Sequence, residues 1–170
     1  MDSKQIISHG FGPAFDADSK ALILGSFPSV KSREQSFYYG HPQNRFWKVM
    51  AAICKAQVPE TIEEKKAFLA AHHIAVYDVI ESCTITGSSD SSIRNVTVTD
   101  LSEILDHSKV GSHIYANGAK AYDLYRRYTL PKTGIEAVKL PSTSPANAAW
   151  SLDRLIATWG SKLTEILIHD

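Results

Sequence analysis

Four short apolar runs recur along this 170-residue chain, separated by longer stretches with a different hydrophobic period. The runs cover residues 21–24, 74–77, 113–116 and 135–138. Most of them are flanked by Gly, Ser, Asn or Pro, and all are too short for a typical helix. This pattern predicts four buried β-strands.

Between these runs, apolar residues recur every three or four positions, as in amphipathic helices. Helices are predicted after residues 44, 61, 100 and 118, and over residues 152–167. Thr61 and Glu64 have the spacing of a capping box, so a helix should begin there. The helix after Gly118 should end before Pro131, because proline lacks the N–H that a helix interior needs.

Alternating strands and helices predict a single α/β domain over residues 1–170, with α/β/α layers and a central four-stranded parallel sheet. No repeat, low-complexity segment or linker interrupts the chain. Ligands bind outside the carboxyl ends of such strands. The segments that follow the four runs should therefore converge on one cleft, and Asn117 and Gly118 among them are interpreted as a plain turn. These segments are residues 25–29, the stretch from Asp78, residues 117–118 and residues 140–147.

Composition narrows the class of protein without identifying it. With 44% hydrophobic and 21% charged residues, the chain fits a soluble globular protein rather than a disordered one. No apolar stretch approaches the roughly 20 residues that span a bilayer, and the N-terminus lacks a signal-peptide pattern. We therefore expect a cytoplasmic protein with no membrane partner. Cys54 and Cys83 have no metal-ligand spacing, so we expect reduced thiols, no metal and no cofactor.

Three motifs carry a more specific signal, because their residues follow one another in a recognisable order. Residues 25–29 read GSFPS, residues 41–47 read HPQNRFW and residues 140–147 read LPSTSPAN. Together they resemble the uracil-DNA glycosylase superfamily and, within it, the hypoxanthine-DNA (deoxyinosine) glycosylase branch. Residues 77–80 and 87–93 are similar to this branch as well, and the middle motif also resembles mismatch-specific uracil-DNA glycosylases.

The resemblance implies a uracil-DNA glycosylase-like fold and a monofunctional glycosylase of base-excision repair. Such an enzyme swings a deaminated base out of duplex or single-stranded DNA and hydrolyses its N-glycosidic bond. We expect hypoxanthine as the first substrate and uracil as the second. The net charge is zero, with 18 Lys and Arg against 18 Asp and Glu, so DNA contact would rest on local positive charge. Candidates for that charge are Lys31, Arg33, Arg45 and Lys48. A monomer is expected.

Two departures from the superfamily pattern bear on the catalytic residue. Many uracil-removing relatives hold the attacking water with an acidic or amide residue where this chain has Phe27, and they carry a histidine where it has Leu140. Another residue must hold the water, and Asn44 is the candidate. Its carboxamide oxygen can accept a hydrogen bond from water and aim it at the anomeric carbon. The simpler alternative is that Asn44 caps the following helix.

Four residues are candidates for binding the everted base. Asp78 follows the second strand, where related enzymes carry an amide that reads the base edge. A carboxylate only accepts hydrogen bonds, so it suits the N1–H of hypoxanthine or the N3–H of uracil and not the bare N1 of adenine. Phe27 and Tyr39 can stack on a base, and His41 can touch the base or a phosphate. The alternatives are a turn cap for Asp78 and ordinary packing for the three rings.

Two loops supply candidate DNA contacts. Hydroxyls and backbone amides of the last motif suit phosphates, and its proline and asparagine could wedge into the base stack. A serine-rich loop near residue 90 offers a second set of candidate phosphate contacts. A plain turn and a solvated loop are the alternatives. The candidate residues are Ser142, Thr143, Ser144, Pro145, Asn147, Ser89 and Arg94.

Two other functions stay open on the sequence alone, because a fold does not determine a function. The first is a noncatalytic lesion-binding module on the same fold, which the changes at Phe27 and Leu140 would fit. The second is a hydrolase of free nucleosides or nucleotides, which the zero net charge would fit. Base release from DNA, measured beside DNA binding and beside free inosine, separates the three.

Overall fold

The central feature of the fold is a four-stranded parallel sheet with the order β3-β2-β6-β7, as the predicted α/β class requires. The computed structural model describes residues 4–86 and 94–168. The strands are β2 (Ala21–Gly25), β3 (Ile74–Asp78), β6 (Ile114–Asn117) and β7 (Val138–Leu140). All three neighbouring pairs run parallel. Each of the four apolar runs thus contributes residues to one strand of this sheet.

The fourth strand begins later than the apolar pattern predicts. Residues 135–138 were the predicted strand, but β7 starts at Val138. Ile135 is held instead by side chains, because its N–H donates to the Thr133 hydroxyl and its carbonyl accepts from the Tyr125 hydroxyl. A backbone whose polar groups are already paired in this way has no free donor and acceptor for the sheet.

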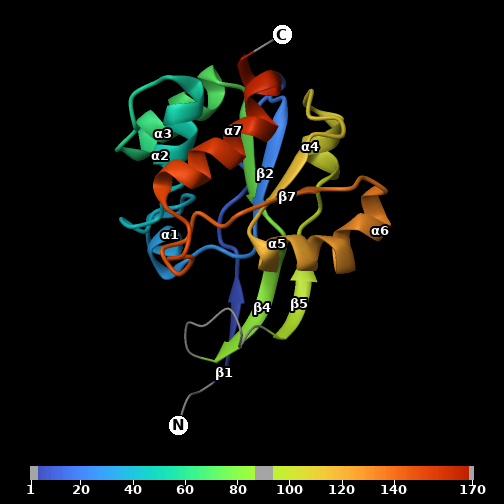
Figure 1. Cartoon of the computed structure of the whole chain (residues 1–170). Helices are drawn as coiled ribbons and strands as arrows, with labels where there is room; N and C mark the ends of the chain where they lie inside the picture. Colours follow the sequence, from blue (N-terminus) through green and yellow to red (C-terminus); the bar gives the residue numbers. More distant parts are fainter. Residues whose placement is uncertain (1–3, 87–93, 169–170) are drawn as a thin grey trace.

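Helices cover both faces of the sheet, so the predicted three layers are confirmed (Figure 1). Helices α2, α3 and α7 lie on one side and α4, α5 and α6 on the other, as right-handed crossovers require. Thr61 caps α3, and the capping box with Glu64 is formed as predicted. The helices are α1 (Val30–Gln35), α2 (Phe46–Cys54), α3 (Ile62–Ala71), α4 (Ser102–Asp106), α5 (Ala119–Leu124), α6 (Leu130–Thr133) and α7 (Leu152–Ile168).

The helix after Gly118 does not end before Pro131, so that prediction was wrong. It continues through a π-helical turn, Tyr125–Thr129, into α6, which contains Pro131 in its first turn. A π-turn pairs each N–H with the carbonyl five residues back, as Leu130 does with Tyr125. The wider turn changes the register just before the proline and places it where a missing N–H costs little.

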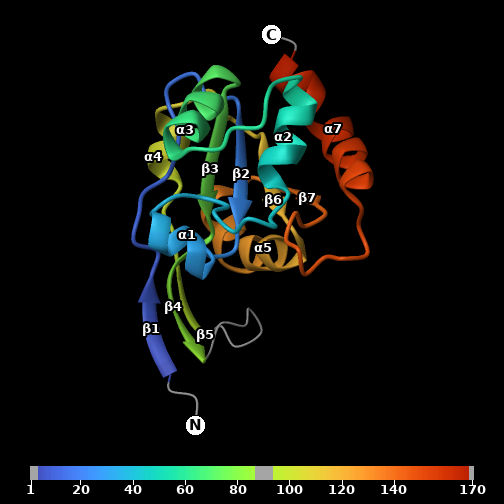
Figure 2. The same cartoon turned by 90° about the vertical axis from the view of Figure 1, so that its left-hand side faces the viewer.

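A second, antiparallel sheet was not predicted. It has the order β1-β4-β5 and consists of β1 (Lys4–Ser8), β4 (Ile80–Thr86) and β5 (Arg94–Val98). Figure 2 shows these strands extending away from the helical layers, on the side where α1 and α5 lie. Because β4 follows β3 after a single residue, Asp78 lies where the two sheets meet.

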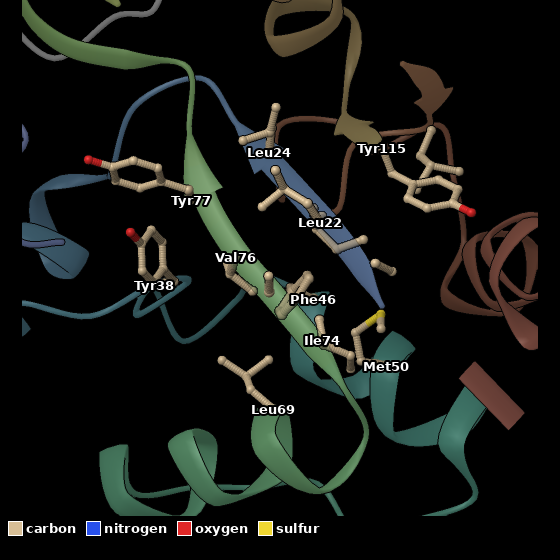
Figure 3. Close-up of a cluster of buried hydrophobic side chains, with 14 of the residues drawn as sticks. Leu22, Leu24, Tyr38, Phe46, Met50, Leu69, Ile74, Val76, Tyr77 and Tyr115 are labelled. Carbon is tan, nitrogen blue, oxygen red and sulfur yellow. The ribbon is translucent and has the colours of Figure 1, made fainter. Parts of the chain in front are cut away.

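Apolar side chains on both faces of the parallel sheet form the core (Figure 3). Every residue of β2 and β3 is buried, which explains why these strands read as continuous apolar runs instead of alternating ones. Phe46 and Met50 of α2 and Leu69 of α3 pack against this sheet. Phe46 therefore anchors the start of α2 in the core, within the second motif.

Candidate active site

A cleft of about 730 Å³ lies at the carboxyl ends of the parallel strands. All four segments predicted to converge there contribute to its lining: residues 25–29, Asp78, residues 117–118, and Ser142 to Ser144 with Ala146. Tyr39, His41 and Asn44, in or beside the second motif, line it as well. The volume lies within the usual range for small-molecule sites, about 300–1,000 Å³. The three motifs therefore share one cavity.

Asn44 lines the cleft and lies just before Arg45, the N-cap of α2, so the structure does not make Asn44 the N-cap itself. Its Oδ1 accepts the backbone N–H of Phe46 at 2.9 Å and the hydroxyl of Thr143 at 2.8 Å. A carboxamide oxygen has two lone pairs, and here both are used. The amino group, Nδ2, donates no hydrogen bond to any residue that the structure describes. It is the polar group of Asn44 left for a ligand.

Thr143, whose hydroxyl donates to Asn44, is fully buried. Its hydroxyl accepts from Asn117 Nδ2 at 3.0 Å, and its N–H donates to Asn117 Oδ1 at 3.1 Å. Asn117 Nδ2 also donates to the hydroxyl of Tyr39, at 3.3 Å. The expected phosphate contact of the Thr143 side chain conflicts with this burial. Asn117, which was interpreted as a plain turn residue, connects three segments of the site.

Tyr39 has an unusual backbone conformation for an aromatic residue, with φ of 52°. Its ring stacks on Phe46 with centroids 4.0 Å apart and an angle of 20° between the planes. Burial and the nearby charge of Asp78 raise the pKa of Tyr39 above its ordinary value, so the hydroxyl stays protonated. Left-handed backbone at a bulky residue is strained and persists only where the surroundings enforce it. Here the strain places the hydroxyl beside Asn117.

Asp78 is nearly buried, with 4% of its surface exposed, and it forms part of the cleft lining. Its Oδ2 lies 2.7 Å from Nε2 of His9, a residue just after β1 that is itself buried. Its Oδ1 lies against Gly25, where a Cβ atom would overlap it. Only glycine therefore fits beside this carboxylate as the last residue of β2.

His9 was missed by the sequence analysis, because no motif surrounds it and it lies outside every predicted element. Aromatic rings enclose its imidazole, with centroids between 4.5 Å and 6.2 Å away. Two of them, Tyr38 and Tyr77, have pKa values raised chiefly by burial, that of Tyr77 to about 12. The enclosing rings are Phe11, Phe27, Tyr38 and Tyr77.

Phe27 is partly buried and also lines the cleft, between His9 and the cations of α1. Its ring meets His9 edge-on, at 88°, and the guanidinium of Arg33 lies 5.6 Å from its centroid. Lys31, Arg33 and Lys120 line the cleft, whereas Asp78 is the one carboxylate among its lining residues. The cavity is thus locally positive although the chain has no net charge. Lys120 was not among the predicted cations.

Arg45 organises the last motif instead of supplying charge to the surface. Its guanidinium donates to the carbonyls of Ser144 at 3.0 Å and Asn147 at 3.1 Å, and also to that of Trp150. The planar fork of arginine suits several fixed acceptors at once. The loop from Thr143 to Trp150 is therefore fastened to the start of α2.

The remaining predicted DNA-binding residues differ in position. Ser142 and Ser144 are half-buried at the cleft, and each hydroxyl accepts a backbone N–H two residues on. Pro145 is exposed, whereas the Asn147 carboxamide donates to the Ser142 carbonyl within the loop. His41 lines the cleft, and its Nδ1 accepts the N–H of Gln43. Ser89 and the side chain of Arg94 lie outside the described residues.

Neither a metal cluster nor a membrane helix is found in the part of the chain that the structure describes. No three His, Cys, Asp or Glu side chains among residues 4–86 and 94–168 group as metal ligands would. Within the same ranges, no helix has the length and apolar character needed to cross a bilayer.

Comparison with known proteins agrees with this geometry. The profile of the uracil DNA glycosylase superfamily matches residues 13–161. A protein of Methanosarcina acetivorans named hypoxanthine DNA glycosylase is 33% identical over 150 residues, which cover 88% of this chain and 94% of the relative. One of the same name from Methanosarcina barkeri is 29% identical over 139 residues, covering 81% and 87%.

A solved structure supports the same assignment of the fold. It is a solution NMR structure of a Methanosarcina acetivorans protein provisionally named a uracil DNA glycosylase. The TM-score is 0.80 at 31% identity, with 95% of this chain and 99% of the other covered. Together with the profile match across all three motifs, these similarities show that the chain belongs to the uracil DNA glycosylase superfamily.

Proposed function

We propose that this chain is a monofunctional DNA glycosylase that releases deaminated bases from DNA, hypoxanthine first and uracil second. Membership of the superfamily and two relatives named hypoxanthine DNA glycosylase support this activity, a hydrolysis of N-glycosidic bonds. The observation that carries it is the convergence of Asn44, Asp78 and Phe27 on one locally positive cleft. Because one chain forms the whole cleft, we expect it to act as a monomer.

The first step is eversion of the target nucleotide into the cleft. Lys31, Arg33 and Lys120 would neutralise phosphates near the entrance, and the half-buried hydroxyls of Ser142 and Ser144 would contact the backbone. Arg45 donates hydrogen bonds to backbone carbonyls of the loop that carries these hydroxyls, and so holds the loop in place. A rigid loop lowers the ordering cost of binding.

Base recognition follows from the chemistry of Phe27 and Asp78. The Phe27 ring would stack on the everted base, an interaction worth about 1–3 kcal/mol per base. Asp78 Oδ1 accepts no hydrogen bond from the described residues and is free to accept the N1–H of hypoxanthine or the N3–H of uracil. Adenine offers an acceptor at N1, so it would leave a nearly buried carboxylate facing a lone pair.

Asn44 would hold the attacking water through its amino group. Because Oδ1 is occupied by Phe46 and Thr143, Nδ2–H donates to the water oxygen, and the second lone pair of the water faces the sugar. The N-glycosidic bond breaks with its electron pair leaving on the base, and the water oxygen then bonds to the resulting sugar cation without the help of a strong base. The proton that the water loses passes to solvent or to the departing base anion. This revises the expectation that the carboxamide oxygen orients the water.

A panel of labelled oligonucleotides tests the activity. Each would carry deoxyinosine, deoxyuridine or deoxyxanthosine opposite each of the four bases, with alkali cleaving the abasic sites formed. We expect the fastest release from deoxyinosine and none from free inosine. Tight binding of lesion duplexes without base release on long incubation would contradict glycosylase activity and support a lesion-binding module. Release confined to free nucleosides would support a nucleoside hydrolase.

A further inference from the structure

The buried contact between His9 and Asp78 lies directly behind the proposed base-reading carboxylate. Nε2 of His9 is 2.7 Å from Asp78 Oδ2, and the two side chains are only 1% and 5% exposed. The contact joins the antiparallel sheet to the parallel sheet, because His9 follows β1 and Asp78 ends β3. Neither the motifs nor the mechanism above requires a histidine at this place.

The surroundings of His9 indicate which nitrogen carries its proton. Nδ1 is buried and has no hydrogen-bond partner among the described residues, and aromatic rings enclose the imidazole. A buried N–H without an acceptor is rarer in proteins than a buried acceptor without a donor. We therefore assign a proton to Nε2, which donates it to Asp78 Oδ2, and none to the partnerless Nδ1.

This donation changes how many acceptors the carboxylate offers to a base. Oδ2 is turned into the interior by His9, whereas Oδ1 lies against Gly25 in the cleft lining. A carboxylate with both oxygens free pairs with two adjacent donors in a forked geometry. Asp78 can offer only Oδ1.

Guanine and hypoxanthine differ in the number of N–H donors on the edge that Asp78 would contact. Hypoxanthine has one donor on this edge, N1–H, whereas guanine has N1–H and a neighbouring 2-amino group. A free carboxylate would thus favour guanine, the normal base, over the lesion. Oδ2 keeps a second lone pair, but its contact with the buried His9 holds it in the interior, so the 2-amino group would lose its water partners without gaining an acceptor.

We propose that His9 is a specificity-determining positioning residue that restricts Asp78 to one acceptor oxygen and thereby excludes guanine from the site. The inference rests on the proposed function, since it assumes that Asp78 reads the everted base. It adds a reason why an enzyme that recognises an N1–H donor leaves undamaged guanine in place.

The test compares base release by wild type, His9→Leu and His9→Gln. Hypoxanthine or guanine is placed opposite the same abasic analogue, so that pairing in the duplex does not differ, and single-turnover rates are measured at about pH 8, where free carboxylates are ionised. We expect His9→Leu to raise the ratio of guanine to hypoxanthine release roughly ten- to a hundredfold, the usual effect of one unpaired polar group. His9→Gln retains an N–H donor and should keep the wild-type ratio.

Each outcome separates this inference from the function on which it rests. A folded His9→Leu that loses both activities by the same factor would show that His9 only supports the structure, and would overturn the inference alone. Lack of hypoxanthine release by the wild type would reject the proposed function and the inference with it. If His9→Leu does not fold, nitrogen NMR of labelled wild-type histidine decides, because a proton on Nδ1 instead of Nε2 overturns the inference without an activity assay.

Discussion

Replacing Asn44 by aspartate separates its contacts at the start of α2 from the water-holding role that we propose for it. In Asn44→Asp, the new carboxylate would keep an oxygen for the N–H of Phe46 and the hydroxyl of Thr143, but would replace the Nδ2 donor with an acceptor. Asn44→Ala removes all of these groups together. The pair of variants therefore distinguishes support of the helix start from handling of the water.

The magnitudes follow from the hydrogen bonds of Asn44. Asn44→Ala loses the hydrogen bond to the Phe46 N–H at the start of α2, worth about 1 kcal/mol, and leaves the proton of the buried Thr143 hydroxyl unpaired, at about 1–2 kcal/mol. For a chain of this size, the sum corresponds to a fall in Tm of roughly 5–10 °C. Asn44→Asp retains both acceptors and should change stability by less than about 1 kcal/mol. It should nonetheless slow base release by about 10²–10³, the usual effect of removing one catalytic donor.

The assay is single-turnover release of hypoxanthine, with thermal melting as the control for folding. Stability near the wild-type value combined with a large loss of rate in Asn44→Asp would agree with a water held by Nδ2. A rate equal to or above the wild-type rate in Asn44→Asp would refute this reasoning, because it would mean that an acceptor, not a donor, holds the water. Full activity in Asn44→Ala would remove Asn44 from the mechanism.

Four further outcomes are expected. Gly25→Ala should displace the Asp78 carboxylate, because the added Cβ overlaps Oδ1; it should lower stability by about 1–3 kcal/mol and reduce hypoxanthine release, and wild-type behaviour in melting and release assays would count against this packing. Arg45→Lys cannot reproduce the forked contacts to the last motif, so limited proteolysis should cut that loop faster than in wild type. Lys120→Gln should reduce the slope of log K against log salt for duplex binding by about 0.9, and an unchanged slope would exclude a phosphate contact. Burial raises the pKa of the Cys54 thiol to about 11, so alkylation should be slow near neutral pH and rise with pH or unfolding, whereas fast labelling of the native protein would contradict its burial.

The part of the site that could be predicted consists of local features. Strands buried on both faces are continuous apolar runs, so β2 and β3 stand out in the sequence. Once four parallel strands are expected, the segments at their carboxyl ends must meet, and residues 25–29 and the serines of the last motif do line one cleft. The capping box at Thr61 is equally local.

Only the tertiary structure decided the contacts between residues that are far apart in the chain. His9 and Asp78 are 69 positions apart, and Asn44 and Thr143 are 99 apart. No periodicity or spacing marks such pairs, because each side chain obtains its partner from how the two sheets and the last loop pack. The same holds for Arg45, which is an ordinary surface cation by sequence and binds backbone carbonyls in the fold. The sequence by itself thus determined the parallel sheet and the place of the cleft, whereas packing decided which oxygen and nitrogen atoms stay free to face a substrate.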